Sequence, residues 1–175
     1  MVCLATDPDK DATTPGDVLR SLAFYPVFYL GSIPIVLGSL AMLPLNLRAF
    51  RTVVRSWSAW HRWCGSWLLG IKVRIEGKPP VGEAVYALRH ESVFEAIDLP
   101  RLLLNPGVFA KAELIRIPFW GFAGHRFGLI PVERETGAKA LRAMIAAARG
   151  FAGTGRPLAI FPEGTRVPPG SRPPP

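Results

Sequence analysis

His90 is followed five positions later by Glu95 in the stretch HESVFE, and this pair is the first candidate for acid–base chemistry in the chain. A carboxylate bound to one imidazole nitrogen fixes the tautomer of the ring and raises the basicity of the other nitrogen. The pair could therefore remove a proton from a substrate hydroxyl. A structural explanation is also open, because Ser92 and Glu95 have the spacing of a capping box at a helix start.

Two further groups of polar residues directly follow apolar runs. Arg134 ends the stretch GLIPVER, and its guanidinium suits a phosphate, although pairing with a neighbouring glutamate would explain it as well. The stretch FPEGTR is a tight turn that could surround an oxyanion or be an ordinary loop, and its polar positions are Glu163, Gly164, Thr165 and Arg166.

The apolar pattern of the C-terminal two thirds predicts an α/β fold, with a mainly parallel sheet flanked by helices. Strands are expected over 71–77, 84–88, 107–110, 129–133 and 157–161, and helices over 92–104 and 135–152, with a short glycine-broken segment at 117–128. In such sheets ligands gather beyond the carboxyl ends of the strands. His90, Arg134 and Glu163 each follow a predicted strand, so we expect them to meet in one crevice.

Several other kinds of chemistry have no support in the residues. No Gly-x-Ser-x-Gly elbow is present, and Cys64 has no obvious activating neighbour, so an acyl-enzyme is not expected. The three histidines lack the clustered spacing of metal ligands, so no metal site is expected. With two cysteines in the chain, a disulfide framework is not expected either.

The N-terminal third indicates contact with a membrane. Mean hydropathy is +0.24, and no charged side chain occurs from Ser21 to Leu47. That length permits a spanning helix. Pro26, Pro34 and Pro44 interrupt it, so two short helices that enter one leaflet are the alternative. Residues 1–17, which are polar and proline-bearing, are expected to be a disordered tail.

A basic, tryptophan-rich stretch follows. Its cationic residues are Arg48, Arg51, Arg55, Arg62, Lys72 and Arg74, and its tryptophans are Trp57, Trp60, Trp63 and Trp67. This composition suits a membrane interface, although a helical tryptophan face could equally pack on the protein's own core. The excess of arginine predicts that the following domain lies on the cytoplasmic side. The formal net charge of +8 predicts an anionic partner, and no nucleic-acid-binding motif accompanies it.

Taken together, HESVFE, GLIPVER and FPEGTR resemble, in order and spacing, three motifs of the 1-acylglycerol-3-phosphate acyltransferases, a family of the glycerolipid acyltransferase superfamily. The stretch KAELIRIPFWGFAGHRFG at 111–128 fits between the first two motifs, and the resemblance covers about residues 70–172. It implies an enzyme of phospholipid biosynthesis with a glycerolipid acyltransferase-like fold. Such enzymes move an acyl chain from acyl-CoA or acyl-ACP, as co-substrate, to the free hydroxyl of a lysophospholipid. In the best-known case the acceptor is 1-acyl-sn-glycerol-3-phosphate and the product is phosphatidic acid.

The same resemblance implies roles for individual residues. His90 would be the general base and Glu95 the residue that orients it. Arg134 would bind the phosphate of the acceptor, Lys111 would be a further phosphate contact, and the acceptor site would be completed by Glu163, Gly164, Thr165 and Arg166. No bound cofactor is implied. The partners would be the phospholipid surface, the lysophospholipid and the acyl donor.

Two departures from the family pattern lead to alternatives. Glu95 stands where the family commonly has an aspartate, and nothing after Arg166 matches the family's fourth motif, an apolar stretch ending in Val-Pro. We therefore expect a C-terminally truncated chain, divided into a tail (1–17), a membrane-anchoring helical segment (18–69) and an acyltransferase domain (70–175). The alternatives are an inactive lipid-phosphate-binding fragment and an acyltransferase that acts on another lysolipid.

Overall fold

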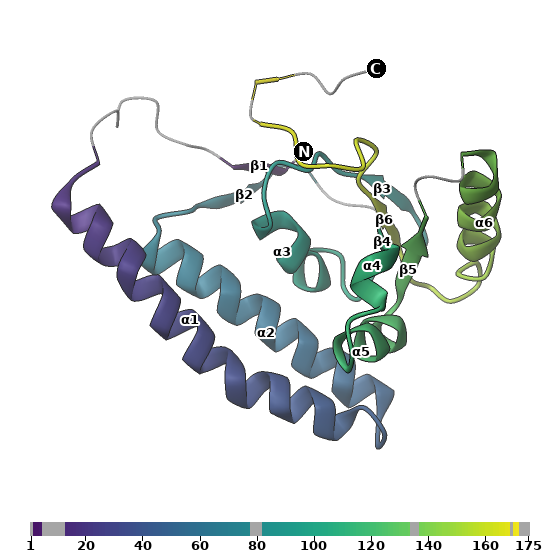
Figure 1. Ribbon diagram of the computed structural model, residues 1–175, viewed down its shortest axis with the longest axis horizontal. Helices are drawn as coiled ribbons and strands as arrows, with labels where there is room; N and C mark the ends of the chain where they lie inside the picture. Colours follow the sequence, from purple (N-terminus) through teal and green to yellow (C-terminus); the bar gives the residue numbers. More distant parts are fainter. Residues whose placement is uncertain (1, 5–12, 78–81, 134–136, 169, 172–175) are drawn as a thin grey trace.

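The computed structural model describes residues 2–4, 13–77, 82–133, 137–168 and 170–171. A hairpin of two long helices, α1 (Pro15–Met42) and α2 (Leu47–Leu68), lies along one side of an α/β layer (Figure 1). The expected boundary at residue 17 falls inside α1. Thr14 caps this helix, since its side chain accepts from the backbone N–H of Asp17 and the Asp17 carboxylate accepts from that of Thr14.

Helix α1 runs unbroken through Pro26 and Pro34. Its 28 residues correspond to a length of about 42 Å at 1.5 Å per residue. The predicted alternative of a break at these prolines is therefore wrong for the described backbone, and Pro44 lies in the turn before α2. Among the described residues, α1 is the one helix with the length and composition to cross a membrane. Most of its large apolar side chains are exposed, among them Leu19, Leu22, Leu30 and Leu37.

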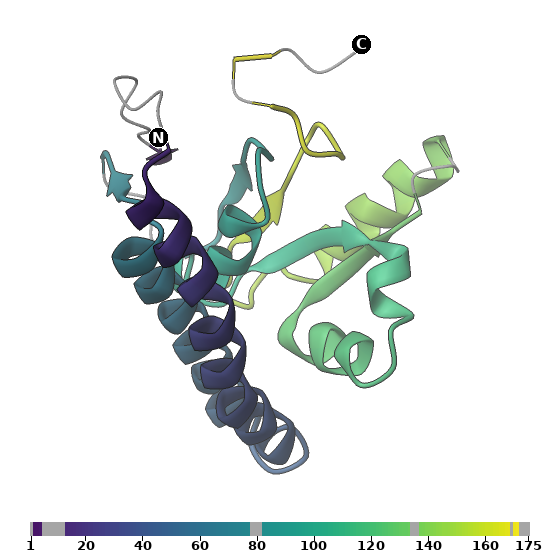
Figure 2. The ribbon, with the colours of Figure 1, turned by 60° about the vertical axis from the view of Figure 1, so that its left-hand side comes forward.

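The two helices pack side by side (Figure 2), and two tryptophans of α2 take part in the contact. The indole N–H of Trp57 donates to the Ser32 hydroxyl over 3.0 Å, and that of Trp60 donates to the Phe28 carbonyl over 3.3 Å. Trp63 and Trp67 instead remain 46% and 69% exposed. Two of the tryptophans thus pack on the protein's own helix, as one interpretation predicted, while a membrane-interface role for the exposed Trp63 and Trp67 stays a prediction.

The main sheet has the strand order β3-β6-β4-β5 and is parallel throughout. Its strands are β3 (Val85–Ala87), β4 (Gly107–Lys111), β5 (Leu129–Val132) and β6 (Leu158–Ile160). The register pairs Val85 with Leu158, and Val108 with both Ala159 and Leu129. Three of these strands fall within the predicted ranges and β4 extends one residue beyond its range, to Lys111. The α/β fold class with a parallel sheet is confirmed.

The first predicted strand has a different partner from the one expected. Strand β2 (Val73–Ile75) does not join the main sheet but pairs antiparallel with β1 (Val2–Leu4). Residues 2–4 therefore form a strand within the segment that was expected to be a disordered tail, whereas residues 5–12 lie outside the described residues.

The helices that connect the strands of the main sheet in sequence pack around it. They are α3 (Phe94–Leu102), α4 (Ala112–Ile115), α5 (Trp120–Phe127) and α6 (Ala138–Arg149). Helix α3 packs on the sheet through Leu99 and Leu103, which contact Val108 and Ala159. A second cluster of Leu43, Phe50 and Phe127 joins the hairpin to α5. The hairpin is therefore fixed to the α/β layer, which is the arrangement that creates the site.

The contact between Gly31 and Trp60 gives a test of the hairpin. A methyl group at Gly31 would lie 2.6 Å from Cε2 of Trp60, whereas one at Gly38 would meet nothing within 4 Å. We expect Gly31→Ala to destabilise the fold, because overpacking costs about 1–3 kcal/mol, more than alanine gains in a helix, up to about 1 kcal/mol. Gly38→Ala is the matched control and should be neutral or stabilising. Denaturant unfolding in detergent, followed by tryptophan fluorescence, measures both, and equal midpoints would contradict the packing.

Candidate active site

The histidine and glutamate of HESVFE are in direct contact. His90 lies just beyond β3, and its Nδ1 is 2.8 Å from Oε1 of Glu95 in the first turn of α3. The same oxygen accepts from the backbone N–H of Glu91 over 2.8 Å and of Ser92 over 2.7 Å. The other oxygen, Oε2, accepts from the Ser92 hydroxyl over 2.6 Å. One carboxylate thus holds the imidazole and the chain before α3 together.

The capping arrangement differs slightly from the one predicted. Helix α3 begins at Phe94 with Val93, not Ser92, at the capping position, and Val93 has no side-chain cap. The Ser92 hydroxyl accepts from the backbone N–H of Phe94 over 3.0 Å, while Glu95 reaches back to the N–H of Ser92. The bonds of the predicted Ser92–Glu95 box are therefore present, although the helix begins one residue later than a cap at Ser92 would place it. Glu95 serves the helix start and the histidine together.

The contact with Glu95 determines which nitrogen of His90 can act as a base. A carboxylate only accepts, so the neutral imidazole carries its hydrogen on Nδ1 and its lone pair on Nε2. The ring stacks on Phe161, with centroids 4.3 Å apart, and its side chain is 20% exposed. Stacking and the hydrogen bond together fix the plane of the ring.

Glu95 is suited to remain ionised. Burial by itself would raise the pKa of its carboxyl group, but hydrogen bonds from the Ser92 side chain, His90 and the backbone outweigh burial and lower the pKa. The site therefore holds a carboxylate against the imidazole at neutral pH.

The FPEGTR turn is attached to His90 through the backbone. The N–H of Val167 donates to the His90 carbonyl over 2.7 Å, and the N–H of Gly164 donates to the Phe161 carbonyl over 3.0 Å. Gly164 has φ +64°, a conformation that glycine adopts without strain. Within the described residues, Oε2 of Glu163 is buried and has no hydrogen-bond partner.

Of the other two predicted phosphate contacts, the structure describes Lys111 but not Arg134. Lys111 ends β4, and its Nζ is 3.5 Å from Oε1 of Glu113, with both side chains about half exposed. Arg134 lies outside the described residues, so its role stays a prediction.

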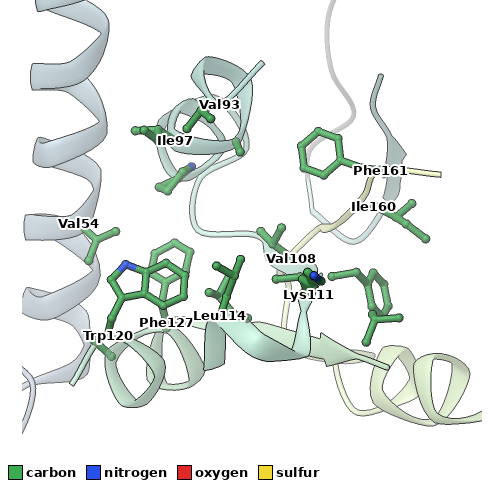
Figure 3. A pocket seen from close by; sticks show the side chains of 18 of the residues that line it. Val54, Val93, Ile97, Val108, Lys111, Leu114, Trp120, Phe127, Ile160 and Phe161 are labelled. Carbon is green, nitrogen blue, oxygen red and sulfur yellow. The ribbon is translucent and has the colours of Figure 1, made fainter. Parts of the chain in front are cut away.

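A large apolar cavity opens beside these residues (Figure 3) and has a volume of about 1320 Å³. Its polar wall contains His90, Lys111, Gly164, Thr165 and Arg166. Its apolar wall combines residues of the hairpin, α3, the sheet, α4 and α5, including Val54, Ile97, Val108, Leu114, Trp120 and Phe127. The structure thus brings five of the predicted positions to one cavity, with Glu95 behind His90.

Sequence reasoning missed the apolar wall. Its residues come from elements far apart in the chain, and no periodicity distinguishes them from ordinary core positions. The one available signal was the dense apolar segment at 117–128, which supplies Trp120 and Phe127. Arg62 also departs from the predicted interface, since it turns inward and pairs with Asp98 of α3.

Comparisons with known proteins identify the family of the chain. Residues 70–174 match the family model described as Acyltransferase, and the chain belongs to that family. It is 28% identical over 159 residues to a 1-acyl-sn-glycerol-3-phosphate acyltransferase of Pseudomonas aeruginosa, covering 87% of this chain and 61% of that protein. It is 35% identical over 100 residues to a protein of the same name from Helicobacter pylori, covering 57% of this chain and 42% of the relative. The chain thus spans about half the length of these relatives. No solved structure gives a significant match.

The lowered pKa of Glu95 predicts a pH-dependent stability. A carboxyl whose pKa is lower in the folded than in the unfolded chain stabilises the fold above the unfolded value, near 4.5, and this contribution disappears as pH falls through the folded pKa. We therefore expect wild type to exceed Glu95→Gln in unfolding free energy by a margin that is constant at neutral pH and shrinks below pH 4.5.

Unfolding curves between pH 7 and pH 3 measure this margin. Ser92→Ala, which removes one donor to the carboxylate, should reduce the pH-dependent part while leaving the fold intact. A margin that does not change with pH would mean that Glu95 is not held as the ionised form.

Proposed function

We propose that the protein transfers a fatty acyl chain from acyl-CoA or acyl-ACP to the free hydroxyl of a lysophospholipid, with 1-acyl-sn-glycerol-3-phosphate as the acceptor and phosphatidic acid as the product. The observation that carries the proposal is the His90–Glu95 pair at the wall of a large apolar cavity that Lys111 and Arg166 also line. Membership of the Acyltransferase family and the names of two relatives support the same reaction.

The proposed chemistry follows from the atoms of the pair. Nε2 of His90 takes the proton of the acceptor hydroxyl as its oxygen attacks the thioester carbonyl. A C–O bond forms and the carbonyl becomes a tetrahedral oxyanion, which needs donors already in place. When the oxyanion collapses, the C–S bond breaks, and the thiolate leaves and receives the proton from the imidazolium. Glu95 stabilises the imidazolium between these two steps and keeps Nε2 directed at the substrate.

The cavity separates the lipid chain from the charged end of the substrates. Its apolar wall suits an acyl chain, since each buried methylene contributes about 0.8 kcal/mol. Lys111, Arg166 and Arg134 supply cations for the acceptor phosphate, and Glu163, Gly164 and Thr165 complete its site. The exposed apolar side chains of α1 would place the site at an inner membrane, with the α/β domain on the cytoplasmic side.

The base assignment is tested by His90→Ala with His125→Ala as the matched control. His125 is exposed on α5 and does not line the cavity. Loss of a general base should lower kcat by about 10²–10⁴-fold, whereas the His125 variant should keep wild-type activity. Transfer of a labelled acyl chain to lysophosphatidate in phospholipid vesicles measures both. Activity retained by His90→Ala would contradict the base assignment, and no transfer by wild type from either donor would overturn the proposed function.

The acceptor assignment is tested by Lys111→Met, with the exposed Lys139→Met of α6 as control. A hydrogen bond to a charged group contributes about 1.5 kcal/mol or more, so KM for lysophosphatidate should rise roughly tenfold. KM for an uncharged monoacylglycerol should not change, because that acceptor has no phosphate. An equal rise for both acceptors would show that Lys111 does not contact the phosphate, and faster transfer to another lysolipid would reassign the acceptor.

A further inference from the structure

Helices α2 and α3 are joined by a charged contact that the proposed reaction does not use. Nε of Arg62 on α2 donates to Oδ1 of Asp98 on α3 over 2.8 Å, and Nη2 donates to Oδ2. Asp98 is 3% exposed and the Arg62 side chain is 20% exposed. A two-pronged guanidinium–carboxylate pair fixes both the distance and the relative orientation of its partners.

An aromatic contact one turn earlier on α3 joins the same two helices. The ring of Phe94 lies against Gly65 of α2, where a methyl group would be 2.7 Å from Cε2 of the ring. Phe94 also faces His61 of α2, with ring centroids 4.8 Å apart. Gly65 thus leaves the space into which α3 fits.

His61 does not compete with Arg62 for the carboxylate. Burial lowers the pKa of His61, and the nearby Asp98 charge opposes this only in part. The ring therefore stays neutral at physiological pH, and Arg62 remains the cation that faces Asp98.

These contacts are placed around Glu95. Phe94 precedes Glu95 by one residue and Asp98 follows it by three, and positions four apart share a helix face. That face of α3 is directed to α2, while Glu95 reaches back to His90. The position in which α3 packs on α2 consequently determines where the Glu95 carboxylate, and with it the imidazole, lies relative to the cavity.

We propose that Arg62 and Asp98 are positioning residues for the acyl transfer, so that the helical hairpin sets the geometry of the His90–Glu95 pair. This inference rests on the proposed function. Buried ion pairs are often replaced by apolar residues of similar volume with little change in stability. Apolar contacts, however, lack the direction that fixes the rotation and register of a helix. A displacement of about 1 Å in a catalytic group can lower the rate by roughly 100-fold.

The test is a cycle of Arg62→Met, Asp98→Leu and the double variant. Each single change leaves one buried charge unpaired and should lower both the unfolding midpoint and kcat. The double variant should regain a midpoint close to wild type, yet its kcat should stay at least about tenfold below wild type because α3 is no longer held in register. KM for the acceptor should change little. Arg62→Lys keeps the charge without the two-pronged geometry and should give an intermediate kcat.

The exposed pair Arg74–Glu76, at 3.2 Å with side chains 77% and 54% exposed, is the matched control. Arg74→Met with Glu76→Leu should change neither the midpoint nor kcat. A refolded Arg62/Asp98 double variant with wild-type kcat would overturn the positioning role while leaving the proposed function intact.

A second readout needs no substrate, so it separates this inference from the proposed function. The proton resonance of His90 Nδ1–H, assigned by its absence in His90→Ala, reports the hydrogen bond to Glu95. We expect it to shift or broaden in the double variant and in Arg62→Lys, and to be unchanged in the Arg74/Glu76 control. An unchanged resonance in these Arg62 variants would overturn the inference even if the wild-type chain transferred no acyl group.

Discussion

The carboxylate of Glu95 is the contact on which the site depends, because it accepts from His90, from the backbone of Glu91 and Ser92, and from the Ser92 hydroxyl at once. The start of a helix leaves N–H groups without intrahelical partners, and Val93 has no side-chain cap. Glu95 therefore completes the helix start with the same oxygen that holds the imidazole. Capping and orientation of the histidine are one interaction and cannot be separated by substituting this residue alone.

The strand order explains how three distant segments of the chain reach one cavity. Strand β6 lies between β3 and β4 in the sheet, and all three run parallel. The residues after β6, which form the FPEGTR turn, therefore lie between His90 after β3 and Lys111 at the end of β4. The bond from Val167 to the His90 carbonyl fixes the turn to the histidine loop. The site thus lies beyond the carboxyl ends of these parallel strands, where ligands gather in open parallel sheets.

The residues at the carboxyl ends of the strands could be predicted from the sequence because the patterns that indicate them are local. Four short apolar runs gave the strands, and the polar residues after them gave His90 and the FPEGTR turn, although Glu163 is not among the residues that line the cavity. Other features depend on distant partners. The pairing of β2 with Val2–Leu4 could not be predicted because the partner strand lies in a segment whose composition indicated disorder. The apolar wall combines side chains from several elements. Arg134 carries a local signal as well, yet its placement stays a prediction.

The prolines made a break in α1 one of two alternatives, and the helix does not have it; a packing partner lies beside this part of the helix. A proline removes one backbone donor, but Gly31 and Ser32 sit between the two prolines where Trp57 and Trp60 of α2 pack against the helix. Packing against α2 thus adds stabilising contacts to the part of the helix that lies between and beside the prolines. The same packing places the exposed apolar side chains of α1 on one side of α2, while Arg62 and Gly65 of α2 contact α3 on another. Helix α2 therefore contacts both α1, with its exposed apolar side chains, and α3, which carries Glu95, so a displacement of the hairpin would be transmitted to the histidine through α2 and α3.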